Sequence, residues 1–176
     1  MKRMIRKLAS GLTGLVAAGA MLAGIAACSP VAASDNATTQ GAAGQGTPHV
    51  HPMSGLAVIP LTVTTAKGKH VFQVEVAATG PQQEHGLMFR TAMGADEGMI
   101  FPSDPPKRTA FWMKNTVIGL DIIYIGTDHK VLNIAANAVP YDETPLPSAG
   151  EVSGVLELNA GRAAQLGITP GAAVNW

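Results

Sequence analysis

Residues 111–125 read FWMKNTVIGLDIIYI, and this stretch decides the fold prediction. Two apolar runs, at residues 109–114 and 120–125, flank a polar connection. Asn115 and Gly119 suit a tight turn in this connection, because both residue types tolerate positive φ. The pattern therefore predicts two short strands that pair as a hairpin.

Alternating apolar residues predict further short strands on both sides of this hairpin. The first begins near residue 58, and the others span residues 70–77, 98–101, 131–139, 153–158 and 172–176. Short connections favour antiparallel pairing. The expected fold class is mainly β (α+β), a small curved antiparallel sheet or partly closed barrel with two short helices.

Local signals place the two helices and the exposed loops. Thr79 and Gln82 have the spacing of a capping box, which predicts a helix that ends near residues 87–88. Asn159 is expected to cap a second helix at residues 160–166. Prolines indicate exposed loops at residues 102–107 and 140–150.

Strand alternation also assigns side chains to faces. In the strand at residues 70–77, Phe72 and Val74 are expected to face inward and Glu75 outward.

The chain of 176 residues carries 12 basic and 12 acidic side chains, but their distribution is uneven. Four basic residues and no acidic residue precede Cys28, so the remainder has 8 basic against 12 acidic side chains, a net charge of −4. This balance leaves no basic patch, and we expect no nucleic-acid partner.

The N-terminus has the features of an export signal. Residues 1–27 combine a basic start with an apolar run at residues 12–27 that is too short and too rich in Ala and Gly to span a membrane. The run ends in IAAC at residues 25–28, which resembles the lipobox of bacterial lipoproteins. Ordinary signal-peptidase cleavage after Ala33 is the alternative.

Cys28 is the one cysteine of the chain, which excludes an internal disulfide and makes a thiol-based enzyme implausible. The resemblance implies that Cys28 carries a lipid and that the protein is anchored to a bacterial membrane. Ser29 favours the outer membrane, with the protein facing the periplasm.

Three segments follow from these signals: a signal peptide at residues 1–27, a lipid-anchored flexible tether at 28–57, and a single β-rich domain at 58–176. The tether is predicted from a composition rich in small and polar residues, with no sustained apolar pattern.

Five motifs in sequence order resemble one family. They are GLMFR at 86–90, GMIF at 98–101, WMKNT at 112–116 followed by Leu120 and Asp121, LEL at 156–158, and Ala160-Gly161. The resemblance is to domain-of-unknown-function family 192, also called uncharacterised protein family 0127, and covers roughly residues 60–175. It implies a small β-rich domain, often secreted or lipid-anchored, with no established activity. The family usually has Gly-Asp where this chain has Gly171-Ala172.

The polar motif positions that match the family are the candidate ligand-binding residues. They are Arg90, Lys114, Asn115, Asp121 and Glu157, with Trp112 as an aromatic platform. One interpretation is a pocket for a small polar ligand or an envelope protein. The other, which we favour, is a buried ion-pair network in which Arg90 binds Asp121. For Trp112 we favour a packed indole, and we expect Met99 and Met113 in the core.

Two further functions are considered. His49, His51 and Met53 are soft ligands of the kind that bind copper outside the cytoplasm. Asp121 and Glu157 could act as the two carboxylates of a hydrolase, but no nucleophile, zinc or phosphate-loop motif accompanies them. We therefore expect an extracytoplasmic, lipid-anchored binding or envelope-support module rather than an enzyme.

Overall fold

The computed structural model describes residues 49–176, which form nine strands and two short helices. In chain order these elements are β1 (Val58–Thr65), β2 (Gly68–Val76), α1 (Gly80–His85), β3 (Glu97–Lys107), β4 (Ala110–Phe111), β5 (Leu120–Gly126), β6 (Val131–Ala138), β7 (Leu146–Pro147), β8 (Val152–Asn159), α2 (Arg162–Leu166) and β9 (Ala173–Asn175).

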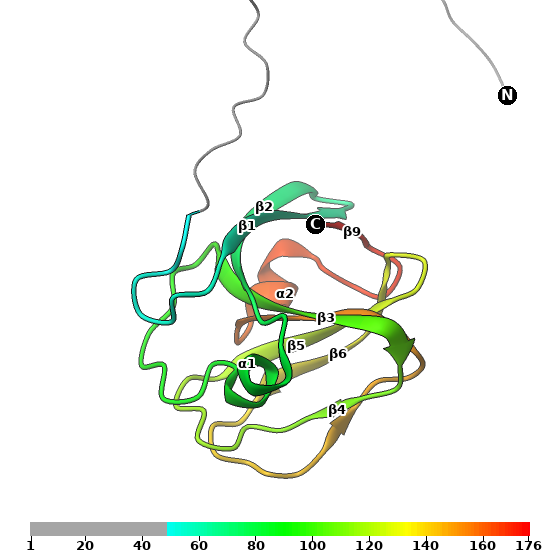
Figure 1. The fold of residues 1–176 in the computed structure, drawn as a ribbon. Helices are drawn as coiled ribbons and strands as arrows, with labels where there is room; N and C mark the ends of the chain where they lie inside the picture. The colour runs from blue at the N-terminus through cyan, green and yellow to red at the C-terminus, as the bar shows by residue number, and fades with distance from the viewer. Residues whose placement is uncertain (1–48) are drawn as a thin grey trace, which may run out of the picture. The chain divides into compact units, whose positions relative to one another are not determined.

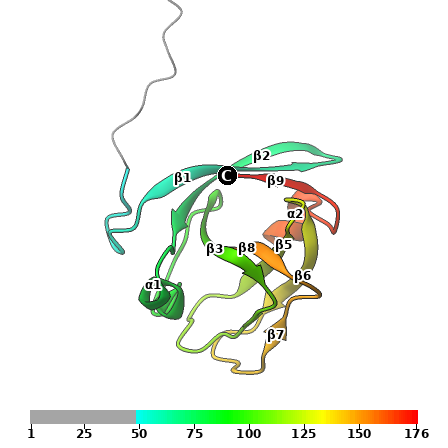
Figure 2. The same ribbon diagram turned by 45° about the vertical axis from the view of Figure 1, so that its right-hand side comes forward.

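Seven strands form one curled sheet in the order β6-β5-β8-β3-β2-β1-β9 (Figure 1). Every neighbouring pair is antiparallel except β2 and β3, which run parallel. An isolated bridge between Lys130 and Ala173 brings the two ends of the sheet together. The curl is visible in both ribbon views (Figure 2). The predicted mainly β fold, a partly closed barrel with two short helices, is confirmed.

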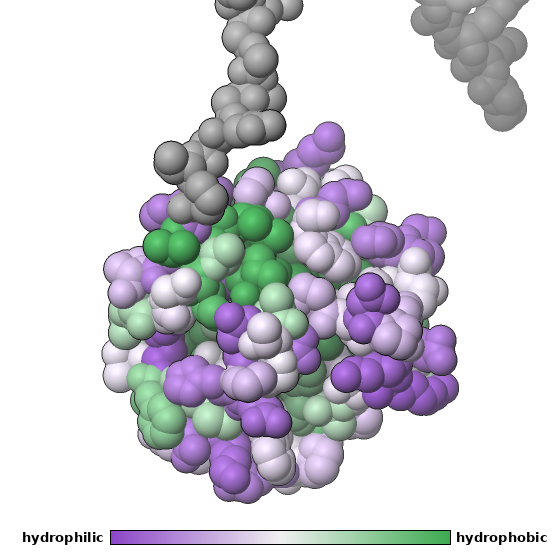
Figure 3. Space-filling view, viewed as in Figure 1, coloured by the Kyte–Doolittle hydropathy of each residue, from purple (hydrophilic) through white to green (hydrophobic). Residues whose placement is uncertain are grey.

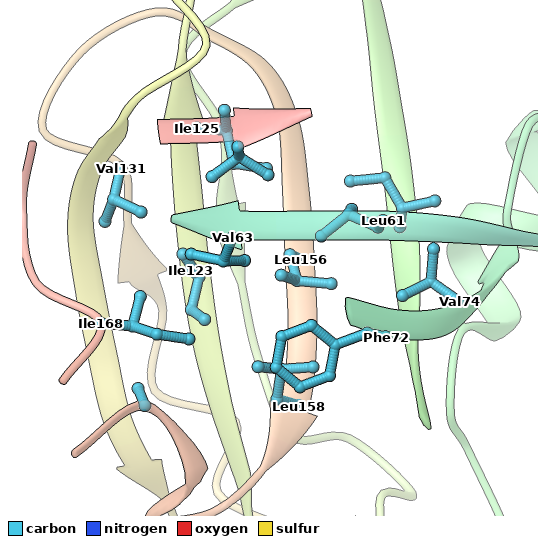
Figure 4. Close-up of a cluster of buried hydrophobic side chains, with 13 residues drawn as sticks. Leu61, Val63, Phe72, Val74, Ile123, Ile125, Val131, Leu156, Leu158 and Ile168 are labelled. Carbon is cyan, nitrogen blue, oxygen red and sulfur yellow. The ribbon is translucent and has the colours of Figure 1, made fainter. Parts of the chain in front are cut away.

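The concave side of the curled sheet holds the first hydrophobic cluster. Side chains from β1, β2, β5 and β8 point toward one another there (Figure 4). Phe72, Ile123, Leu156 and Leu158 are completely buried, and Ala163 brings α2 against the cluster. Burial of this apolar surface is the main force that closes the sheet.

The opposite side of β3, β5 and β8 holds a second hydrophobic cluster. It includes Met99, Met113, Ile122 and Tyr124, all fully buried, so the expected core positions of Met99 and Met113 are confirmed. Because both sides of these strands are covered, all seven residues of β5 are buried. A polar side chain on either face of β5 or β8 therefore loses contact with water, and it needs a hydrogen-bond partner to offset that cost.

The predicted hairpin of residues 109–114 and 120–125 is wrong. Only Ala110 and Phe111 are in strand conformation, and β4 pairs with β7 rather than with β5. The intervening residues form a loop, in which Asn115 takes the expected positive φ. β7 contains Pro147 and lies in the segment predicted as a loop from its prolines. Proline is tolerated there because β7 is a two-residue strand outside the main sheet.

Smaller differences concern the ends of elements. β3 continues to Lys107 through a register shift after Pro102, where an exposed loop was expected. The capping box of Thr79 and Gln82 is present, but α1 ends at His85. Asn159 does not cap α2; its side chain donates to the backbone carbonyls of Met93 and Gly94.

The folded part of the chain includes residues assigned above to the tether. Val50 bridges to Ala57, and the Val58 N–H donates to the His49 carbonyl at 2.7 Å. Leu56 packs against the second cluster. The predicted signal peptide, Cys28 and the tether up to residue 48 lie outside the described residues. Neither helix among residues 49–176 has the length and hydropathy needed to cross a membrane.

The surface in Figure 3 is uneven in hydropathy. Hydrophobic residues gather in the upper part of this face, and hydrophilic residues cover most of its right side. The large hydrophobic side chains that are most exposed are Met53, Phe89, Val139, Tyr141, Val71, Val50 and Trp112. Three of these seven are aromatic, and all three lie in or beside the loops that hold the candidate site.

Candidate functional site

A cavity of about 790 Å³ lies between α1, the end of β3, β4 and the loop that follows β4. Its wall includes four of the six predicted ligand-binding residues, namely Trp112, Lys114, Asn115 and Glu157. Its size is in the range of pockets that bind small molecules. The structure thus brings together predicted site residues that are up to 45 positions apart in the sequence, from Trp112 to Glu157.

Glu157 is the buried ionisable residue of this cavity. It lies on the second-cluster face of β8, between Met99 of β3 and Ile122 of β5, and is 5% exposed. Its carboxyl forms no hydrogen bond or ion pair with any residue in the range 49–176. Burial raises the pKa of Glu157 from 4.5 to about 8, so the carboxyl is mostly protonated at neutral pH.

Aromatic rings form one side of the cavity. Phe111 meets Phe101 edge to face at 5.0 Å between ring centroids. It also meets Tyr124, whose hydroxyl donates to the carbonyl of Leu146. Desolvation raises the pKa of Tyr124 to about 12, so this phenol stays neutral beside the carboxyl. The rings give the cavity an apolar wall of fixed geometry.

Trp112 is 49% exposed, so the packed indole favoured from the sequence is wrong. The ammonium of Lys114 lies over its ring, 5.3 Å from the centroid. This is a cation–π distance, and it shows that one face of the indole is open to a charged group. Trp112 and Lys114 therefore form an accessible edge of the cavity.

Backbone hydrogen bonds between three loops hold this edge. The Phe89 N–H donates to the Asn115 carbonyl at 2.8 Å, and the Tyr141 N–H donates to the Met113 carbonyl at 3.1 Å. Phe89, Asn115 and Tyr141 all have positive φ, between 53° and 64°. Bulky residues rarely adopt this conformation, and such strain is concentrated at functional sites.

Asp121 lies away from the cavity, on the first-cluster face of β5. It is completely buried, and its two carboxylate oxygens accept the N–H groups of Asn137 and Ala163, each at 2.8 Å. The second bond satisfies a donor in the first turn of α2, whose own cap position, Gly161, provides no side-chain acceptor. The role of Asp121 is structural, and it does not face Glu157.

Arg90 is also outside the cavity, and its predicted pairing with Asp121 is wrong. Its guanidinium binds the Glu75 carboxylate through two contacts, at 2.8 and 3.1 Å. Glu75 faces away from Val74 as expected, but it is only 4% exposed, so the solvent exposure implied by an outward position is wrong. Ser54 donates to the same carboxylate, and His51 Nδ1 lies 3.6 Å from it. The cluster attaches residues 49–57 to β2.

Comparison with known proteins agrees with the motifs. A family model described as Uncharacterized ACR, COG1430 (DUF192) matches residues 62–176. The chain belongs to this family.

Two crystal structures resemble this DUF192 member. One is a protein of unknown function from Novosphingobium aromaticivorans, with 59% identity and a TM-score of 0.73, covering 75% of this chain and 94% of that one. The other is a proposed transcription regulator from Sinorhizobium meliloti, with 39% identity and a TM-score of 0.66, covering 68% of this chain and 94% of that one. No curated protein matches the chain.

Two of the three proposed copper ligands of this DUF192 member lie at a second, smaller cavity. His49 and His51 line its volume of about 340 Å³ together with Glu75, Asp96 and Glu97. Met53 is 72% exposed and does not line it. No group of three or more His, Cys, Asp or Glu side chains in residues 49–176 is placed to hold a metal ion.

Sequence reasoning missed several residues of the larger cavity. They are Phe101, Lys107, Thr109, Thr116, and Gln83, Glu84 and His85 of α1. Phe101 and Thr116 stand inside the quoted family motifs and could have been included on that ground. Nothing in the sequence pairs α1 with β8, because that contact depends on how the second hydrophobic cluster packs.

Proposed function

We propose that this protein is an extracytoplasmic, lipid-anchored module that binds a small polar ligand in the cavity between α1 and β4. The observation that carries the proposal is the carboxyl of Glu157, which is buried on the cavity wall without a partner in the described part of the chain. Such a group depends on water or a ligand in the cavity for its hydrogen bonds. A desolvated carboxyl in a cleft is also typical of functional sites.

The composition of the wall supports binding rather than catalysis. Carboxylate chemistry of the kind considered above needs a second carboxylate beside Glu157. Asp121 is on the other face of the sheet, with both oxygens occupied by backbone N–H groups. The hydrolase built on this pair therefore has no geometric support.

The two tryptophans of the chain provide a direct test of binding. Trp112 borders the cavity, whereas Trp176 packs against the first cluster and does not line it. In ¹⁵N–¹H spectra of residues 29–176, a chemically diverse fragment library is expected to shift the indole signal of Trp112 and leave that of Trp176 in place. A library that leaves Trp112 unmoved, or moves both indoles equally, contradicts the proposal.

The membrane anchor is tested separately. We expect mass spectrometry of the protein from a bacterial membrane fraction to show an acylated N-terminal Cys28. The Cys28→Ser variant is expected to appear in the soluble periplasmic fraction. An unmodified wild-type chain that begins at Ser34 would instead indicate ordinary cleavage after Ala33.

Copper binding is the second candidate, because His49 and His51 line one small cavity with carboxylates. Titration of residues 29–176 with Cu(I) and Cu(II) tests it, with His49→Ala as the variant and His129→Ala as the matched control. Equal binding by both variants would exclude this site.

A further inference from the structure

We propose that the ligand is an organic anion of amphipathic shape, which accepts a hydrogen bond from the Glu157 carboxyl and places its anionic group beside Lys107 and Lys114. An apolar middle, about the size of an aromatic ring, would pack against Phe101 and Phe111. This inference rests on the proposed function and specifies the chemistry of its ligand.

The deep end of the cavity requires a hydrogen-bond acceptor. The Glu157 carboxyl has no ion pair with a cationic side chain of residues 49–176, and its raised pKa, about 8, keeps it protonated at neutral pH. A neutral carboxyl presents an O–H donor to the cavity. A ligand carbonyl or hydroxyl satisfies this donor, whereas an ammonium group could bond only to the carbonyl oxygen and would leave the O–H donor without a partner.

The open end of the cavity favours an anion. Lys107 and Lys114 are both exposed there, and neither forms an ion pair with a carboxylate of residues 49–176. Glu84 is the one exposed acidic side chain on the wall. Two lysines against one glutamate give this edge a positive charge, although residues 29–176 carry a net charge of −4. Local charge of this kind attracts anions.

Aromatic side chains line part of the cavity wall. Phe101 and Phe111 hold each other edge to face, and Trp112 continues this surface to the exposed edge. A ring or branched chain that packs there gains binding energy by leaving water. The cavity wall thus combines a buried carboxyl, aromatic rings and two exposed lysines.

Three probes with the same phenyl ring separate the alternatives. N-acetyl-L-phenylalanine has an acceptor carbonyl and a carboxylate, its amide has the carbonyl without the charge, and phenethylamine has a cation. Their affinities for residues 29–176 can be measured by the shift of the Trp112 indole signal. We expect N-acetyl-L-phenylalanine to bind most tightly, its amide about three- to tenfold more weakly, and phenethylamine most weakly.

Variants assign each end of the ligand to its partner. Glu157→Gln keeps a neutral donor and should retain N-acetyl-L-phenylalanine, whereas Glu157→Ala should weaken it about tenfold. Lys114→Gln should remove the preference for the acid over its amide. Lys69→Gln, an exposed lysine that does not line the cavity, is the matched control and should change nothing.

The pH dependence of ligand affinity distinguishes a binding role of Glu157 from a merely structural one. Because protonated Glu157 binds, affinity for the wild type should be level to pH 7 and about tenfold lower at pH 9. Glu157→Gln should show no such fall. The other ionisable groups around the cavity are Glu84, His85, Lys107, Lys114 and Tyr124. His85→Gln should leave the fall between pH 7 and 9 unchanged.

The outcomes separate this inference from the proposed function. Preference for phenethylamine, with loss on Glu157→Gln, would overturn the anion and indicate an amine ligand in the same cavity. Binding of none of the three probes at millimolar concentration would also overturn the inference. Shifts of Trp112 by other library fragments would still support the cavity as a binding site, and their absence would refute both.

Discussion

Replacement of Glu157 by Gln should stabilise the protein in alkaline solution. The carboxyl is 5% exposed, and burial raises its pKa from 4.5 to about 8. At pH values between these two pKa values, Glu157 keeps a proton in the folded chain that it has lost in the unfolded chain. The free energy of unfolding therefore falls as pH rises through this range and becomes level above it.

The rise in pKa sets the size of the effect. At about 1.36 kcal/mol per pH unit, a change from 4.5 to about 8 corresponds to a loss of about 5 kcal/mol between pH 4 and pH 9. This is comparable with the whole stability of many domains, which is about 5–15 kcal/mol. Gln at this position cannot ionise, so it removes the loss and retains nearly the same volume.

Urea unfolding of the wild type and of Glu157→Gln at pH 5, 7 and 9 measures the effect. The difference in unfolding free energy between the two proteins removes the contributions of all other titrating groups. This difference should grow steadily in favour of the Gln variant as pH rises. Glu84→Gln is the matched control, because Glu84 lines the same cavity but is exposed, and its difference should stay constant. Equal differences at pH 5 and pH 9 for Glu157→Gln would refute the desolvated carboxyl.

Three further substitutions test the buried polar groups and the packing of the sheet. Asp121→Ala leaves one buried and one partly buried backbone N–H group without acceptors and should cost about 2–4 kcal/mol in urea unfolding, without a change at the Trp112 indole. Arg90→Met leaves the Glu75 carboxylate buried without its cation and should cost about 3–5 kcal/mol, while the double replacement with Glu75→Leu should recover most of this in the same assay. Gly98→Ala places a Cβ atom 2.6 Å from a backbone oxygen of β8 and should lower Tm strongly, whereas Ala at Gly80, where nothing lies within 4 Å, should not.

The sequence predicted the strands well where alternation is local. The β1–β2 hairpin and the strands β5, β6 and β8 lie where apolar periodicity placed them, because each buries at least one continuous face. Pairing was harder to predict. Residues 115–119 are predicted to connect the two strands of a hairpin, yet β4 pairs with β7 some 35 residues later. The parallel contact of β2 with β3, across α1, also carries no local signal.

Strand alternation predicts which face a side chain takes, but it does not predict whether other segments cover that face. Alternation placed Glu75 opposite Val74, and the structure agrees, but residues 49–57 and Arg90 cover that side and bury the carboxylate. Trp112 was expected in the core because it is large and apolar. It is half-exposed because Met113, its neighbour, takes the inward position.

Two buried carboxyls on neighbouring strands of one sheet show which polar residue needs a functional explanation. Asp121 of β5 accepts hydrogen bonds from two backbone N–H groups. These bonds offset the cost of burying its carboxylate, and one of them also satisfies a donor in the first turn of α2. Glu157 of β8 is nearly as buried, but it has no such partner among residues 49–176. The free-energy cost of burying Glu157 grows with pH, and Leu or Met would fill the same position more favourably. Since stability does not account for Glu157, a ligand that uses its proton is the explanation we propose, consistent with the stability commonly given up at binding sites.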